Sequence, residues 1–119
     1  RTVFCGATMA YSRTVRAGDF VYTSGHTAVD ENGQVGLGDI RAQAQLTFRK
    51  LEKTLATAGC SLADVVKTTV YLADPRDFLV MNQVFSEVFG DQAPTRTTIT
   101  AQPVLDTKIE VDAVAYKPE

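Results

Sequence analysis

An amphipathic segment near the middle of the chain limits the folds that this sequence can adopt. Its apolar residues recur every three or four positions, which is typical of one buried helix face; they are Ile40, Ala44, Phe48, Leu51, Leu55 and Ala58. Asp39 precedes the segment as a favourable N-cap, and Gly59 follows it as a C-terminal glycine. We therefore predict a helix between these two residues. Its polar side, or positions near it, is expected to carry Gln43, Arg49, Lys50 and Lys53.

A second helix is predicted from Asp74-Pro75 to about Phe89. Asp74 is suited to an N-cap, and a proline is well tolerated at the first helical position. The apolar stripe of this segment again has helical spacing, and it consists of Phe78, Met81, Val84, Phe85 and Val88. Asn82 lies beside this stripe, near its edge.

The other segments favour strands, because they are rich in β-branched and aromatic residues. The predicted strands cover residues 11–17, 20–23, 65–72, 94–101 and 108–116, with a sixth short one near Val35. Residues 1–10 show no clear period and are expected to form a loose arm. The resulting order, β-β-α-β-α-β-β, predicts one α+β domain over residues 1–119. In this domain both helices cover one face of a mixed sheet of five to six strands.

The last predicted strand is apolar on both of its faces. Ile109, Val111, Ala113 and Ala115 alternate on one face, and Val114 and Tyr116 lie on the other. Strands of this kind need cover on both sides. Since the two helices cover only one face, we infer that a second subunit covers the other.

Composition limits the classes of partner and the cellular compartment. The chain has 119 residues, a net charge of −2 and a pI of about 5.3, whereas nucleic-acid binders usually carry a basic stripe or patch. Its only cysteines are Cys5 and Cys60, too few for a disulfide framework. No apolar run is long enough to span a bilayer, and no basic-then-apolar leader is present. We expect a cytoplasmic protein with no nucleic-acid or membrane partner.

Arg96 is the first candidate site residue. In the predicted strand after Pro94, Arg96 shares one face with Thr98 and Thr100, and the opposite face, with Ile99, is expected to join the core. A guanidinium beside a row of hydroxyls is suited to binding a small carboxylate through two parallel hydrogen bonds. An arginine on a solvated sheet face is the commoner outcome for such a pattern.

Glu110 is the second candidate, on the strand face opposite to Ile109 and Val111. If the last two strands pair as a hairpin, Arg96 and Glu110 lie on the same sheet face. An arginine that binds an anion and a carboxylate that moves protons form a minimal hydrolytic site. A cross-strand ion pair of small energetic value is the alternative, and the spacing does not decide between them.

Other polar residues offer weaker signals. Tyr11, Ser24 and Asn82 lie at the ends or edges of predicted elements. For each of them, an ordinary structural role is the alternative to a role in the site. His26, the only histidine, is expected to be a turn or rim residue, and one histidine is a poor basis for a metal site. Phosphate-binding and dinucleotide-binding motifs are absent from the sequence. We expect chemistry without a metal or cofactor, or no chemistry.

Several motifs together resemble the Rid family of enamine/imine deaminases, also called YjgF/YER057c/UK114 or endoribonuclease L-PSP. The similar segments cover nearly the whole chain; they are Tyr11-Ser12, Val21-Tyr22-Thr23-Ser24-Gly25, residues 38–43, residues 64–72, Asp77-Phe78, Met81-Asn82, Pro94-Thr95-Arg96-Thr97-Thr98 and residues 108–115. The most specific pair is Pro-x-Arg-Thr followed by Ile-Glu-Val-x-Ala.

The resemblance implies a chorismate-mutase-like fold and a homotrimer with clefts between its subunits. It also implies cofactor-free hydrolysis of enamines and imines such as 2-aminoacrylate, which releases ammonia and a 2-oxo acid. Transferred by position, Arg96 would bind the substrate carboxylate and Glu110 would activate water. The cleft would also be lined by Tyr11, Ser24, Gly25, Asn82 and Thr98.

Three departures from the family pattern leave the substrate open. Thr98 stands where many of these deaminases have cysteine, His26 stands where glutamine is expected, and the loop 102–106 is about one residue shorter than expected. The Thr-Arg-Thr-Thr run and the terminal Ala-Tyr-Lys-Pro also resemble 2-aminomuconate deaminases of the same family, which implies a larger and more acidic substrate.

Two further functions remain alternatives to deamination of small imines. One is a binding or regulatory protein that holds a small carboxylate without converting it. The other is an RNA-cleaving or translation-inhibiting protein, as the older family name suggests. The acidic composition and the lack of a basic aromatic platform weigh against the latter.

Overall fold

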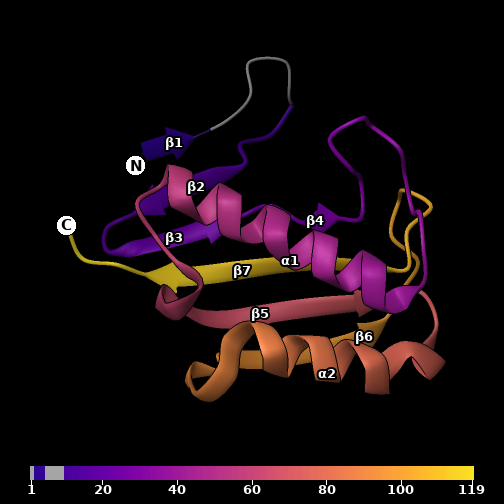
Figure 1. Cartoon of the computed structure of the whole chain (residues 1–119). Coiled ribbons are helices and arrows are strands. Elements are labelled where there is room, and N and C mark those ends of the chain that lie inside the picture. The colour runs from indigo at the N-terminus through magenta and orange to yellow at the C-terminus, as the bar shows by residue number, and fades with distance from the viewer. Residues whose placement is uncertain (1, 5–9) are drawn as a thin grey trace.

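The computed structural model, which describes residues 2–4 and 10–119, contains a mixed sheet covered by two helices on one face (Figure 1). In space the strands follow the order β1-β2-β3-β7-β5-β6, and β4 pairs with β7 beyond the end of β3. Their bounds are Thr2–Phe4, Thr14–Ala17, Phe20–Thr23, His26–Thr27, Val65–Leu72, Thr95–Thr100 and Ile109–Tyr116 for β1 to β7. The α+β class predicted from the sequence is confirmed.

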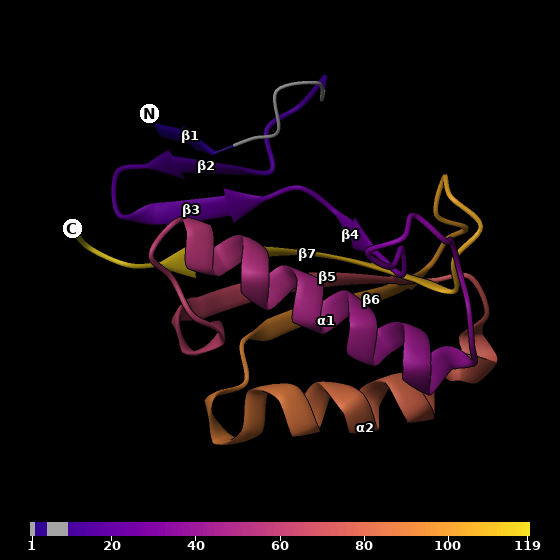
Figure 2. The same cartoon turned by 45° about the horizontal axis from the view of Figure 1, so that its top comes forward.

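The helices α1 (Ile40–Thr57) and α2 (Phe78–Phe89) lie side by side on the same side of the sheet (Figures 1 and 2). The predicted caps are present. Asp39 accepts a hydrogen bond from the backbone N–H of Ala42 at 2.9 Å, and Gly59 has φ of +76°. Asp74 accepts from the N–H of Arg76 and begins a 3₁₀ turn, Pro75–Asp77, ahead of α2.

Gln43 is buried, with 1% of its surface exposed, although the sequence pattern placed it on or near the polar side of α1. Its side-chain amide donates to the carbonyls of Gly36 and Gly38 at 3.0 and 2.9 Å, and its Oε1 accepts from the N–H of Lys108 at 2.9 Å. These three bonds explain why a polar side chain is stable inside the protein. They also join two loops to α1.

Several strand predictions need correction. The expected N-terminal arm contains β1, which pairs with β2, while Cys5 lies outside the described residues. The first predicted hairpin strand is shorter, and the short β4 was not predicted. Near Val35 there is only an isolated bridge to Val29. The last two strands do not pair as a hairpin, because β5 lies between them, parallel to β6 and antiparallel to β7.

The core lies between the sheet and the two helices. Alternate residues of β7 point into it, including Ile109 and Val111, as the sequence pattern predicted. From the helices, Phe48, Phe85 and Phe89 contribute rings whose centroids are 4.6 to 5.9 Å apart. Burial of each such side chain contributes roughly 1.5–3 kcal/mol to folding, so this contact fixes the helices on the sheet.

The opposite sheet face is uncovered within one chain. Exposed aromatic and aliphatic side chains on it are Phe20, Tyr22, Tyr116 and Ile99, at 41, 47, 45 and 44% exposure. Ile99 was expected in the core; it lies instead on this open face, because α2 covers the other face of β6. Of these side chains, the rings of Phe20 and Tyr116 are in contact, with their centroids 5.2 Å apart. Exposed apolar side chains gathered on one face are typical of an interaction site, in agreement with the prediction that the helices leave one face uncovered.

Candidate active site

Arg96 lies on β6, which forms one edge of the sheet, and its side chain points toward α2. The guanidinium carbon is 4.7 Å from the ring centroid of Phe85 and 5.5 Å from that of Phe78, at cation–π distance. Burial lowers the pKa of Arg96. In the described part of the chain its guanidinium has no hydrogen-bond or ion-pair acceptor. Its N–H donors are therefore held in place but unused.

Asn82 and Thr98 lie near this arginine. Asn82 is four residues after Phe78 and three before Phe85 on α2, so it shares their side of the helix. Thr98 follows Arg96 by two residues and shares its strand face. Both side chains are half-buried. The structure thus gathers Arg96, Asn82 and Thr98 at one edge of the sheet, and we call them the arginine group.

Glu110 lies on β7, on the open face of the sheet. Its carboxylate is half-buried against Gly25, where a Cβ atom would overlap Oε2 of Glu110. Burial, followed by repulsion from the neighbouring Asp112, raises the pKa of Glu110. A carboxylate with a raised pKa is a stronger base than an ordinary glutamate, which suits it to accept a proton from water.

Tyr11, Ser24 and Gly25 line one cavity of about 380 Å³ beside β4 and α1, which we call the Tyr11 cavity. Ser24 donates a hydrogen bond from Oγ to the carbonyl of Ser12 at 2.6 Å. Gly25 contributes to the cavity wall and also contacts Glu110. Three of the predicted cleft residues therefore lie together, next to the predicted base, and with Glu110 they form the glutamate group.

Arg96 and Glu110, the charged residues of the two groups, lie on opposite faces of the sheet. Strand register places Arg96 beside Thr68, and Thr68 beside Ala113, on the face that the helices cover. Glu110 pairs with Tyr71 on the open face. The hypothesis that both side chains share a face depended on a hairpin that does not form. One chain therefore holds two separate half-sites.

His26 is buried rather than a turn or rim residue. Its Nδ1 lies 2.8 Å from the carbonyl of Ser24, so it donates there, and Nε2 accepts from Oγ1 of Thr54 at 2.7 Å. Burial lowers the pKa of His26, an effect to which Lys50 and Arg13 add by repulsion. A lone histidine in the sequence gave no signal for this buried role, because its partner lies on a distant helix.

Sequence reasoning also missed the cations around the Tyr11 cavity. Arg13, Lys50 and Lys53 line it. The spacing of Lys50 and Lys53 predicts that they share one side of α1, but only the packing of β4 against α1 brings Arg13 to the same cavity.

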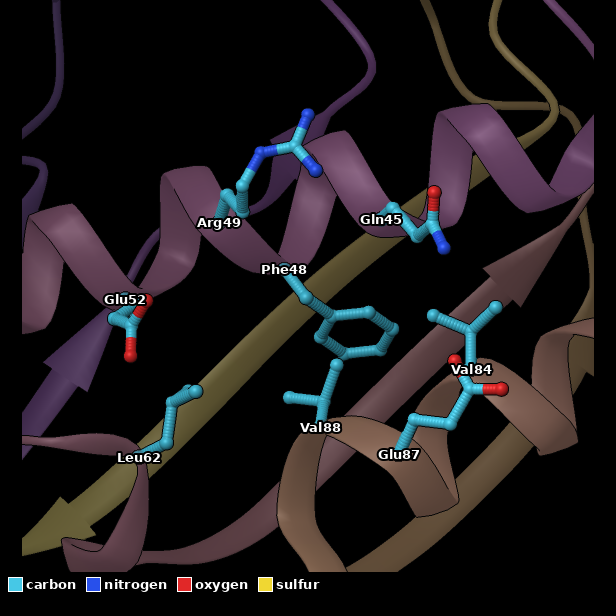
Figure 3. A pocket seen from close by; sticks show the side chains of 8 residues that line it. All are labelled: Gln45, Phe48, Arg49, Glu52, Leu62, Val84, Glu87 and Val88. Atoms are coloured by element: carbon cyan, nitrogen blue, oxygen red, sulfur yellow. The ribbon is translucent and has the colours of Figure 1, made fainter.

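A groove of about 420 Å³ separates the outer sides of α1 and α2 (Figure 3). Phe48 and Val88 point toward one another across its floor, while Arg49 and Glu87 lie at its rim. None of the predicted site residues lines this groove. Among the described residues no group of three acidic, histidine or cysteine side chains could hold a metal ion, and no helix there is long and apolar enough to cross a membrane.

Comparison with known proteins shows the family to which the chain belongs. The family model described as Endoribonuclease L-PSP matches residues 4–117. The chain belongs to this family, which is the Rid or YjgF/YER057c/UK114 family. This L-PSP family member is 40% identical to a RutC family protein of Pyrococcus abyssi over 90% of the chain and 86% of that relative.

Other relatives of this L-PSP family member carry functional names. The human protein named 2-iminobutanoate/2-iminopropanoate deaminase is 34% identical over 94% of the chain and 83% of that protein. Among solved structures, Escherichia coli TdcF with bound serine superimposes with a TM-score of 0.86 at 30% identity. The superposition covers 95% of this chain and 92% of TdcF.

Proposed function

We propose that this protein is a cofactor-free deaminase that hydrolyses small enamine and imine carboxylates, of the 2-aminoacrylate type, to ammonia and a 2-oxo acid. The observation that carries the proposal is the pair of half-sites: a guanidinium without an acceptor, held over two aromatic rings, and a half-buried carboxylate with a raised pKa. The names of the human and E. coli relatives support the same chemistry.

The proposed site forms between two subunits of a homotrimer. Within one chain, the sheet separates Arg96 from Glu110, so a small substrate cannot contact both. A neighbour that packs on the open sheet face would bring its arginine group to the glutamate group of the first chain. The exposed side chains of Phe20, Ile99 and Tyr116 would be buried in the same contact.

Each half-site has one task in the proposed reaction. Arg96 of one subunit binds the substrate carboxylate through two N–H donors, and Asn82 and Thr98 offer further hydrogen bonds. The enamine first becomes the imine by gaining a proton on carbon and losing one from nitrogen. Glu110 of the other subunit then accepts a proton from water as the oxygen bonds to the imine carbon, and the imine nitrogen takes that proton to complete the carbinolamine. The carbinolamine nitrogen takes a further proton from solvent, the C–N bond breaks as the hydroxyl group loses its proton and becomes the carbonyl, and ammonia leaves.

Fixed positions for the carboxylate and the water account for most of the catalysis in this scheme. Reactants held in the right geometry avoid much of the entropy cost of an encounter in solution. Burial around Glu110 strengthens it as a base, and Gly25 leaves room for its carboxylate. A site with few functional groups is sufficient, because imines already react with water unaided.

The test is release of ammonia and 2-oxo acid from freshly generated 2-aminoacrylate. Wild type is compared with Arg96→Lys and with Arg49→Lys, a matched change at an exposed arginine in the groove of Figure 3. We expect Arg96→Lys to lose most of the acceleration, since lysine cannot form the planar pair of bonds, and Arg49→Lys to retain it. Wild type without acceleration would overturn the proposal; binding of a carboxylate without turnover would then indicate a binding protein.

A further inference from the structure

The Tyr11 cavity is strongly basic. Arg13, Lys50 and Lys53 line it from the segment before β2 and from α1, and His26 lies in its wall. Lys50 and Lys53 are three residues apart on the helix, so their charges repel one another on one side of it. The proposed deaminase chemistry uses none of these four residues.

These cations have no carboxylate partner in the described part of the chain. The ion pairs of the described residues involve other cations, Arg16, Arg41, Arg76 and Lys117, and acidic residues outside this cavity. The charges that act on Lys50 are positive: burial and then Arg13 lower its pKa. Residues 5–9, which lie outside the described residues, contain no Asp or Glu in the sequence. Positive charge in this cavity is therefore not neutralised by the protein itself.

The cavity also holds unused hydrogen-bond donors. Lys50 donates one Nζ–H to the carbonyl of Thr27 at 2.8 Å, which leaves two more on the same ammonium. The side chains of Arg13 and Lys53 make no hydrogen bond or ion pair among the described residues. The bond to Thr27 anchors Lys50 at the cavity wall, so its remaining donors are held in place rather than freely solvated.

We propose that the Tyr11 cavity is a binding site for a small oxyanion, a carboxylate or phosphate group held by Arg13, Lys50 and Lys53. The volume of about 380 Å³ accommodates a small molecule. Repulsion among the cations is relieved when an anion binds between them, so the ligand makes favourable contacts and removes unfavourable ones at once.

Two sources of the anion share this chemistry. Because Gly25 belongs to the cavity wall and contacts Glu110, the anion can be a second acidic group of the deaminase substrate. It can equally be a separate anion that binds beside the active site. The first source depends on the proposed deaminase function, whereas binding of the anion itself does not.

Binding is tested with inorganic phosphate, titrated into the 119-residue chain at constant ionic strength and followed by amide NMR. We expect saturable shifts at residues 24–27 and 50–57. Affinity should fall about tenfold in Arg13→Met and in Lys53→Met, each of which removes one charged donor. Arg49→Met removes a charge from the same helix but faces the groove between the helices, and it should bind phosphate as wild type does.

Failure to saturate, or equal weakening in Arg49→Met, would overturn the proposal, because it would indicate general attraction to surface charge.

A second experiment identifies the source of the anion. If phosphate competes with an imine that carries two acidic groups, and Lys53→Met raises KM for that imine but not for a monocarboxylate imine, the anion is part of the substrate. Phosphate binding without competition identifies a separate anion. If the protein lacks deaminase activity but binds phosphate, the proposed anion site is supported and only the proposed deaminase function is overturned.

Discussion

Arg96 and Glu110 project from opposite faces of one sheet, on strands that β5 separates. The arginine lies under α2, and the glutamate lies on the open face beside Gly25. Each chain therefore carries two half-sites that it cannot join by itself, and the proposed deaminase chemistry requires a second copy.

Ile99 provides a test of the proposed assembly. Ile99→Glu places a charge on the open sheet face, where a neighbouring subunit would leave it buried without a partner. We expect the dissociation constant of the oligomer to rise at least about tenfold, with loss of deaminase activity at low protein concentration. Light scattering measures the oligomer. Ala63→Glu, at an exposed position in the 3₁₀ turn Leu62–Asp64 between α1 and β5, is the control and should assemble normally. Wild type that is monomeric would contradict the assembly.

Glu110→Gln tests the proposed base. Loss of general base catalysis typically lowers kcat by roughly 10²- to 10⁴-fold. In wild type, kcat should fall as the pH drops through the raised pKa of Glu110, at a higher pH than for an ordinary glutamate. The raised pKa also means that folding stability from this group is present at low pH and is lost as the pH rises through it. The glutamine variant should therefore be at least as stable as wild type at neutral pH. A variant with unchanged kcat would remove Glu110 from the mechanism.

Gly25→Ala should separate activity from stability. A Cβ atom would overlap Oε2 of Glu110, and the carboxylate, as the end of a flexible side chain, can turn away. Gly25 has no positive φ, so alanine adopts its backbone conformation without strain. We expect little change in the midpoint of urea unfolding but a fall in kcat of at least about tenfold. Equal activity would show that the carboxylate need not lie where the structure places it.

The buried bond between His26 and Thr54 should contribute to stability. Thr54→Val leaves Nε2 of His26 buried without a donor, at a cost of about 1–3 kcal/mol in the free energy of unfolding. Urea denaturation measures this cost. Glu52→Gln, exposed on the same helix, is the control and should change the free energy of unfolding by about 0.5 kcal/mol or less.

The same histidine predicts a pH dependence. Because the pKa of His26 is lowered in the folded state, its contribution to stability is present above its ordinary pKa of about 6.5 and is lost as the pH falls toward the lowered value. Wild type should thus lose more stability than His26→Gln between pH 7 and 5. Parallel pH profiles for the two proteins would contradict the lowered pKa.

Local signals in the sequence were sufficient for most of the fold. The apolar stripe from Ile40 and the caps at Asp39 and Asp74 define the helices, because helix periodicity and capping depend on neighbouring residues alone. The uncovered sheet face also followed from local alternation in β7. Of the cleft residues that the family resemblance implies, Tyr11, Ser24 and Gly25 line one cavity, and their roles in the site stay predictions.

What the sequence could not provide was the arrangement of distant segments. The face on which Arg96 lies depends on β5 inserting between β6 and β7, a long-range pairing that no local pattern encodes. The buried partner of His26 and the meeting of Arg13 with Lys50 likewise depend on packing between β4 and α1. Gln43 was misplaced because its partners are backbone groups of loops.

The buried amide of Gln43 has a consequence for the chemical ageing of the protein. Hydrolysis of this amide to a carboxylate would replace its two donors by an oxygen that faces the carbonyls of Gly36 and Gly38. Attraction to these two carbonyls would become repulsion, and the loop that carries them would be loosened from α1, while Oε1 would still accept from Lys108. Burial keeps water from this amide while the protein is folded. Each unfolding event therefore exposes the Gln43 amide to hydrolysis, although the intact amide helps the chain to refold.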